Sequence, residues 1–155
     1  MKATDVGFTV QISTLSVKSS TAPEFVDITN LVKDVIRNSR VRNGIVVVYS
    51  KHTTAAIKIQ ENEPLLLEDM TNLLERLAPM DEVYGHNDFN VRTVHMNEDE
   101  CPNGHSHCQH LMLSSSESIP LVDGYLALGQ YQAIFMVELD RDKSEREILV
   151  QVMGV

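Results

Sequence analysis

The chain has 155 residues, of which 43% are hydrophobic and 23% charged, a composition typical of one folded globular domain spanning residues 1–155. The formal net charge of −9 argues against a general nucleic-acid or membrane-surface binder, because both kinds of partner select basic proteins. No apolar run approaches the roughly 20 residues that cross a bilayer. Residues 1–5 carry no signal-peptide pattern, so we expect a cytoplasmic protein whose two cysteines stay reduced.

The first half of the chain predicts strands and one amphipathic helix. Residues 8–15 alternate between apolar and polar side chains, as in a half-buried strand. Asp27 is a suitable N-cap for a helix over residues 28–36, where apolar side chains recur at helical spacing. Residues 45–50 are continuously apolar and β-branched, which indicates a central strand, and residues 57–61 alternate again as a second one.

A second helix begins at Pro64, because proline suits the first turn of a helix. Its apolar stripe runs from Leu66 to Leu77, and Asp69 lies at the edge of that stripe. An acid in that place is either a boundary charge or a group directed at a site.

Regular patterning stops over residues 78–106, and a loop of this length is usually functional or disordered. Four strand-like runs follow it, with a hairpin turn at residues 122–125. The runs are residues 107–113, 117–122, 125–128 together with 132–139, and 146–153. The short turns imply antiparallel pairing. We therefore predict an α+β fold, an antiparallel β-sandwich-like core with two main helices.

Histidines gather at the end of the long loop, where residues 103–110 hold three of the six in the chain. The apolar residues that follow favour a strand over 107–113. On a strand His105 and His107 would share a face, as a chelating pair or a substrate clamp, whereas His110 would point away. A pair of histidines is a moderate metal signal, and a third ligand must come from elsewhere in the fold.

Other candidates stand next to predicted strands. His52 follows the buried strand 45–50, where a side chain is held firmly yet faces a cleft, although a core-edge histidine fits as well. Glu61 precedes a helix, a place where an acid is favoured by the helix dipole without any function. His86 and His95 lie in the long loop, where a solvated side chain is the simpler interpretation.

The sequence lacks the glycine-rich nucleotide motifs, the Gly-x-Ser-x-Gly elbow and the His-Glu-x-x-His zinc motif. Nucleotide-binding folds and the common hydrolases therefore lose support. The imidazoles and carboxylates that remain suit acid–base chemistry or a metal ion.

Four stretches of the sequence together resemble the YjbQ-type family, whose members are called secondary thiamine-phosphate synthases. They are His52-Thr53-Thr54-Ala55-Ala56 with Glu61-Asn62, Tyr84-Gly85-His86, Asn103-Gly104-His105-Ser106-His107, and Ser116 through Gln132. The resemblance covers nearly the whole chain. It implies a homotrimer with a sandwich-like core and a histidine-lined cleft.

The same resemblance implies which side chains face that cleft: His52, Glu61, Asn62, Asp69, His86, His105 and His107. Gln132 is kept from the family pattern as a further substrate contact, although Tyr131 replaces the usual tryptophan beside it. The family reaction joins an aminopyrimidine diphosphate to a thiazole phosphate and releases pyrophosphate.

Such a reaction needs a divalent ion on the diphosphate. In this interpretation Glu61 and Asp69 hold Mg²⁺ directly or through water, and protonated His52 stabilises the leaving oxygens. An imidazole-rich site of His86, His105 and His107 suits Zn²⁺ or Mn²⁺ better than Mg²⁺. The identity of the ion stays open.

Two other functions compete with the transferase. One is a metal-dependent hydrolase of a small phosphate or carbonyl compound, with the three histidines on the ion and Glu61 as base. The other is a non-enzymatic protein that binds a metabolite or a metal. All three predict a small-molecule ligand and no nucleic acid or membrane partner.

Overall fold

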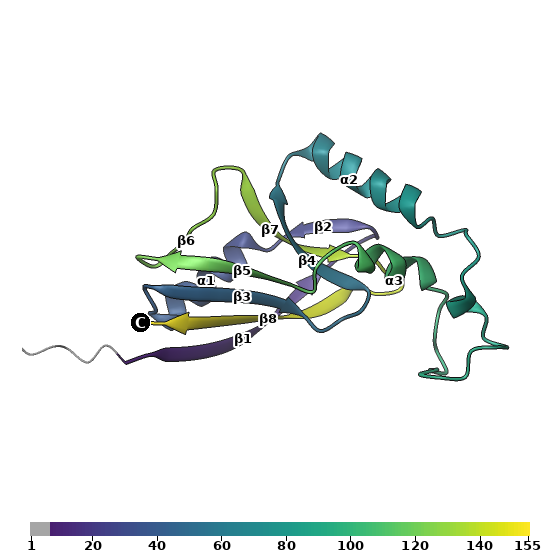
Figure 1. Ribbon diagram of the computed structural model, residues 1–155, viewed down its shortest axis with the longest axis horizontal. Helices are drawn as coiled ribbons and strands as arrows, with labels where there is room; N and C mark the ends of the chain where they lie inside the picture. Colours follow the sequence, from purple (N-terminus) through teal and green to yellow (C-terminus); the bar gives the residue numbers. More distant parts are fainter. Residues whose placement is uncertain (1–6) are drawn as a thin grey trace, which may run out of the picture.

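The computed structural model describes residues 7–155, so residues 1–5, which entered the signal-peptide argument, lie outside the described part. It has the predicted α+β architecture, with two antiparallel sheets (Figure 1). The larger sheet has five strands in the order β1 (Thr9–Lys18), β8 (Glu145–Gly154), β3 (Gly44–Ser50), β5 (Ser116–Val122) and β6 (Tyr125–Leu126). The smaller sheet has the order β2 (Glu24–Asp27), β7 (Gln132–Glu138) and β4 (Ala55–Glu61).

The main core lies between the two sheets and includes helix α1 (Thr29–Ser39). The helix buries Val32, Val35 and Ile36 at the spacing that the sequence predicts. Asp27 lies two residues before the first helical residue, and its Oδ1 accepts a hydrogen bond from the Thr29 amide at 2.8 Å. The N-cap itself is Ile28, with no side-chain capping bond, so the prediction of Asp27 as the N-cap is wrong by one residue.

Strand β7 is the centre of the smaller sheet, and residues 133–138 are all buried. A strand covered on both faces reads as a continuous apolar run rather than an alternating one. The strand ends in Glu138, a fully buried carboxylate. The break in hydrophobicity at Glu138 and Asp140 marks the point where the sheet meets the cleft described below.

The hairpin between β5 and β6 follows its sequence signal. Val122 pairs with Tyr125, and the two residues between them, Asp123 and Gly124, have φ angles of 52° and 85°. Left-handed conformation at both central residues is the requirement of a type I′ turn, which Asp-Gly satisfies at low cost.

Helix α2 (Pro64–Leu77) begins at the predicted proline and is capped by Glu63, whose carboxylate accepts from the amides of Leu65 and Leu66. It runs along one side of the molecule (Figure 1), and Leu74 is its one fully buried residue. The side chains of Leu73 and Leu77 are exposed. No helix within residues 7–155 is long and apolar enough to cross a membrane.

The prediction of a strand over residues 107–113 is wrong, because Gly104–Leu111 forms a third helix, α3. His105 and His107 therefore do not share a face, since two residues apart on a helix means about 200° of rotation. Strand β2, which the sequence did not predict, pairs with β7. Cys108, on helix α3, is exposed.

Candidate functional site

A cleft with a volume of about 1030 Å³ lies where α3 and the 85–103 segment meet the ends of β4 and β7. Its walls combine imidazoles, carboxylates and hydroxyls. The lining residues are Thr53, Thr54, Gly85, His86, Arg92, Val94, His95, Asn97, Asp99, Glu100, Cys101, Asn103, His107, Asp140, Asp142 and Lys143.

The loop that carries His86 is fixed against the start of α3. It contains a short 3-10 helix, Gly85–Asn87, and the Asn87 side chain accepts a hydrogen bond from the Gly104 amide at 2.9 Å. A Cβ atom at Gly104 would lie 2.6 Å from the Tyr84 Cβ, so the contact needs a glycine there. The Tyr84 hydroxyl donates to the Pro79 carbonyl. These contacts hold the loop beside the helix.

The result of this docking is a pair of imidazoles in one wall of the cleft. The rings of His86 and His107 meet edge to face, with their centroids 4.6 Å apart. Burial and the nearby His86 lower the pKa of His107, so its ring is neutral at pH 7. The buried His86 Nε2 has no hydrogen-bond partner and lies 3.9 Å from Glu100 Oε1.

Arg92 closes the long loop on itself and is not free to bind a ligand. Its guanidinium donates to the carbonyl of His95 at 2.9 Å and also contacts the carbonyl of His86. It forms an ion pair with Glu100, and this hydrogen bond lowers the pKa of the Glu100 carboxyl. The 88–100 segment is thus a wall of the cleft that the contacts of Arg92 hold in place.

His105 lies apart from the imidazole pair and does not line the cleft. Its ring is 6% exposed and packs against Tyr84 with a centroid distance of 6.4 Å. Burial lowers its pKa. Its Nε2 lies 3.3 Å from the Ser106 hydroxyl, which in turn donates to the Leu139 carbonyl at 2.6 Å. In the single chain His105 therefore supports α3.

A carboxylate that the sequence analysis passed over forms the floor of the cleft. Asp140 follows β7 and is only 3% exposed, yet it lines the cleft. Its Oδ2 accepts from the Asn103 side chain and its Oδ1 from the Asp142 amide, each at 3.1 Å. The sequence around Asp140 has the composition of a polar turn, which does not suggest a site. The one signal for Asp140 was its place as a charged residue directly after a buried strand.

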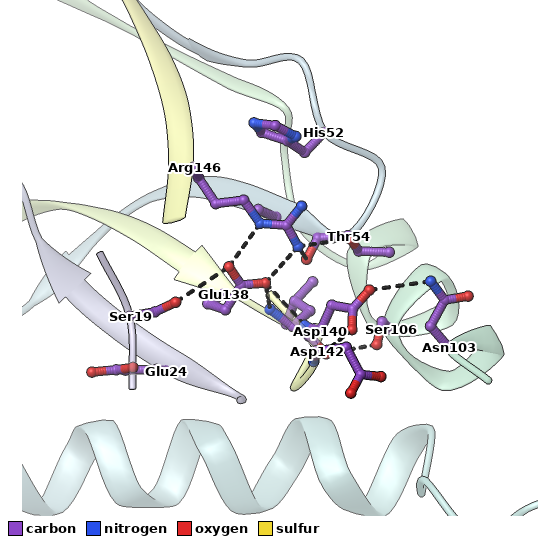
Figure 2. A network of polar contacts seen from close by, with 12 residues as sticks. Ser19, Glu24, His52, Thr54, Asn103, Ser106, Glu138, Asp140, Asp142 and Arg146 are labelled. Carbon is purple, nitrogen blue, oxygen red and sulfur yellow. Dashed lines mark hydrogen bonds and ion pairs between the residues drawn. The ribbon is translucent and has the colours of Figure 1, made fainter. Parts of the chain in front are cut away.

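His52 lies behind the cleft rather than in its lining. Burial lowers the pKa of His52, and the charge of Arg146 lowers it further. Figure 2 shows Arg146 between His52 and Glu138. The neighbours Thr53 and Thr54 do line the cleft. A neutral His52 does not fit the predicted protonated ring that would stabilise leaving oxygens.

The remaining predicted residues lie at the opposite end of the smaller sheet. Glu61 pairs with Gln132 at one end of the β4–β7 ladder, whereas Ala55 pairs with Glu138 at the other. At about 3.3 Å per residue, these ends are about 20 Å apart. Asn62 donates to Asp27 at 2.8 Å.

Asp69 is likewise separate from the histidines, because it is an exposed residue in the first half of α2. Of the eight predicted site residues, the cleft lining includes His86 and His107.

The set of possible metal ligands in this arrangement is incomplete. Among residues 7–155, no group of three or more His, Cys, Asp or Glu side chains is placed to hold an ion by itself. The buried His86 Nε2 without a partner, and its neighbour His107, supply two nitrogen donors. Two protein ligands fit an ion that arrives with a substrate phosphate better than a resident zinc, which takes three or four.

The fold and the site together define a class of protein. It is a small α+β protein with two antiparallel sheets and a histidine-containing cleft beside the end of the smaller sheet. The chain belongs to the UPF0047, YjbQ-like family, whose model matches residues 13–155.

Proteins of this family are similar over nearly the full length of the chain. A UPF0047 protein from Methanothermobacter thermautotrophicus is 39% identical over 140 residues, which is 90% of each chain. YugU from Bacillus subtilis is 30% identical over 145 residues, 92% of this chain and 99% of its own.

Solved structures share the fold. A YbjQ-like protein of unknown function from Sulfolobus solfataricus superposes with a TM-score of 0.85 at 30% identity, covering 96% of this chain and 100% of its own. A hypothetical protein from Aeropyrum pernix superposes with a TM-score of 0.80 at 29% identity, covering 93% and 98%.

Proposed function

We propose that the cleft binds a small phosphorylated molecule together with a divalent metal ion and transfers a group from it. The thiamine-phosphate-synthase reaction, which joins an aminopyrimidine diphosphate to a thiazole phosphate, is the specific candidate. The observation that carries the proposal is the pair of adjoining imidazoles, His86 and His107, in the wall of a large polar cleft.

The size and chemistry of the cleft support two small substrates. A volume of about 1030 Å³ lies at the upper end of the usual range for ligand sites. Lys143 supplies positive charge, while Asp140, Asp142 and Asp99 supply oxygen ligands. In this proposal Asp140 and Asp142 take the metal-supporting role that the sequence analysis gave to Glu61 and Asp69.

The chain's own groups would act in binding and orientation. The His86 and His107 nitrogens would complete the coordination of an ion carried on the diphosphate, which neutralises charge on the departing pyrophosphate. Zn²⁺, Mn²⁺ and Mg²⁺ are all candidates. Thr54 lines the same cleft, so its side chain would lie next to the substrate.

A metal-dependent hydrolase is the second candidate, because paired imidazoles suit Zn²⁺ or Mn²⁺ and an open cleft admits water. Both candidates predict loss of activity with a chelator. They differ in the second substrate, because a hydrolase consumes a phosphorylated compound alone and a synthase requires the thiazole phosphate.

The test is turnover by the purified protein with the aminopyrimidine diphosphate, with and without the thiazole phosphate, a divalent ion and a chelator. Coupled product supports the synthase, and pyrophosphate or phosphate release from the first compound alone supports the hydrolase. A rate no higher than that of H107A in every mixture contradicts both. A protein that binds without turnover is then the remaining candidate.

We also infer a homotrimer. The outer face of the larger sheet presents three rows of four side chains with no charge among them. The rows are Val10, Met153, Ile45 and Pro120; Ile12, Gln151, Val47 and Ser118; and Thr14, Leu149, Tyr49 and Ser116. An uncharged patch of this size, in a chain of net charge −9, favours burial against another subunit.

The second surface for such an assembly is the exposed stripe of α2, with Leu73 and Leu77 45% and 57% exposed. Rings with three-fold symmetry need two different surfaces that meet, and a sheet face and a helix stripe are such a pair. Two free, exposed cysteines fit a reducing compartment, which supports the proposed cytoplasmic location.

A further inference from the structure

A fully buried ion pair lies behind the cleft floor. Arg146 Nε donates to Glu138 Oε2 at 2.7 Å, and Arg146 Nη2 donates to Oε1 at 2.6 Å. Glu138 is 0% exposed and Arg146 is 5% exposed. Two charges removed from water are costly, and an apolar pair of similar size is often as stable or more stable. Stability alone is therefore a poor explanation for this pair.

The contacts of Glu138 fix the backbone that carries Asp140. Its Oε1 accepts from the amides of Leu139 and Asp140, both at 3.0 Å. The Leu139 amide also donates to the Thr54 carbonyl at 3.1 Å. The position of the Asp140 main chain, and so of its carboxylate in the cleft floor, depends on the Glu138 carboxylate.

The contacts of Arg146 fix the adjacent part of the cleft lining, at Thr54. Its Nη2 donates to Thr54 Oγ1 at 2.9 Å as well as to Glu138. Figure 2 shows the guanidinium spanning the space between Glu138 and Thr54. A lysine has a single ammonium in place of this planar fork and is a poor substitute at such a bridging site.

We propose that the Glu138–Arg146 ion pair is a positioning element, which holds Thr54 and Asp140 side by side in the cleft lining so that Asp140 accepts a hydrogen bond from an N–H or O–H of the bound ligand. Asp140 contacts the ligand, and Glu138 and Arg146 act through it. The identity of the ligand in this inference rests on the proposed function. The role of the ion pair in fixing the main chain at Leu139 and Asp140 does not depend on it.

The test compares three variants with the wild-type protein. E138L/R146M replaces the pair with apolar side chains of similar length. R146K keeps a charge opposite Glu138 but removes the bridge to Thr54. The control, K58M/E117L, removes a partly exposed ion pair between β4 and β5, and neither of its residues lines the cleft.

Two measurements are made on the wild-type protein and on each variant. Amide hydrogen exchange is followed at Leu139 and Asp140, and the affinity for the aminopyrimidine diphosphate with Mn²⁺ is measured by calorimetry. In E138L/R146M we expect exchange at both amides at least tenfold faster and affinity at least tenfold lower. In R146K the amides stay protected while affinity still falls. The control changes neither.

Affinity equal to wild type in R146K and E138L/R146M overturns the inference, as does an equal loss in the control. If the wild-type protein binds no diphosphate, the proposed function fails, and exchange then decides alone. In that case Leu139 and Asp140 amides as slow in E138L/R146M as in the wild type overturn the positioning role. Should E138L/R146M not fold, R146K carries the decision through its affinity, and affinity equal to that of the wild type in R146K then overturns the inference.

Discussion

His86 and His107 come from a loop and a helix, and their rings meet edge to face with centroids 4.6 Å apart. Burial, and next to it the nearby His86, lower the pKa of His107. His107 therefore presents a neutral ring beside His86, and the neutral imidazole is the form that binds a metal.

Acid should destabilise the protein in a defined range. Burial is the main cause of the lowered pKa values of His52, His105, His107 and His110. The unfolded chain then binds more protons below about pH 6.5, the ordinary histidine pKa. The free energy of unfolding should stay level above that pH and decrease as the pH falls through the lowered pKa values.

Thermal melts from pH 8 to pH 5 measure this decrease. The variant H105Q removes one buried imidazole, and its melting temperature should depend less steeply on pH than that of the wild type. Identical slopes for the two proteins would show that His105 does not contribute.

The glycine at the start of α3 should be indispensable for the docking of the His86 loop. In G104A the new Cβ would meet Tyr84 Cβ at 2.6 Å and Cγ at 2.8 Å. Overpacking of this kind costs about 1–3 kcal/mol, which urea denaturation should detect. Gly85 is the matched control, because a Cβ there meets no atom within 4 Å. Equal loss of stability in G85A would argue against the steric cause.

The uncharged patch on the outer face of the larger sheet should be a subunit contact. Ile45 lies in the central strand of that sheet, with its side chain on the outer face. I45K puts a charge into the proposed interface and should convert trimers to monomers in analytical ultracentrifugation. V91K, on a loop residue that is 74% exposed, serves as the control. A trimer that survives I45K rules out this face.

Much of the fold follows from local sequence patterns. The alternation in β1, the β-branched run in β3 and the Asp-Gly turn are all signals that need no tertiary contact. Helix α3 is different, because its buried residues are polar. Ser106 and Gln109 are buried through hydrogen bonds to Leu139, Leu74 and Ala78 carbonyls. Hydropathy cannot register burial of that kind, so the apolar residues after His110 suggested a strand.

The sequence predicted part of the candidate site, because some of its residues stand out by type and others do not. His86 and His107 stood out as histidines in a long loop and in a cluster, but only the fold brings their rings together. Glu61 and Asn62 are near His52 in the chain and near the far end of β4 in space. Asp140 was missed because its neighbours have the composition of a turn, and its burial depends on Asn103 and Glu138.

The most direct test of the account is calorimetric titration of the purified protein with the aminopyrimidine diphosphate in the presence of Mn²⁺, repeated without the ion and with H107A. H110N, on the same helix but outside the cleft lining, is the control. We predict binding that needs the ion, weakens at least tenfold in H107A and is unchanged in H110N. Binding of equal strength without Mn²⁺ and in H107A would contradict the central claim that the His86–His107 pair forms a metal–phosphate site.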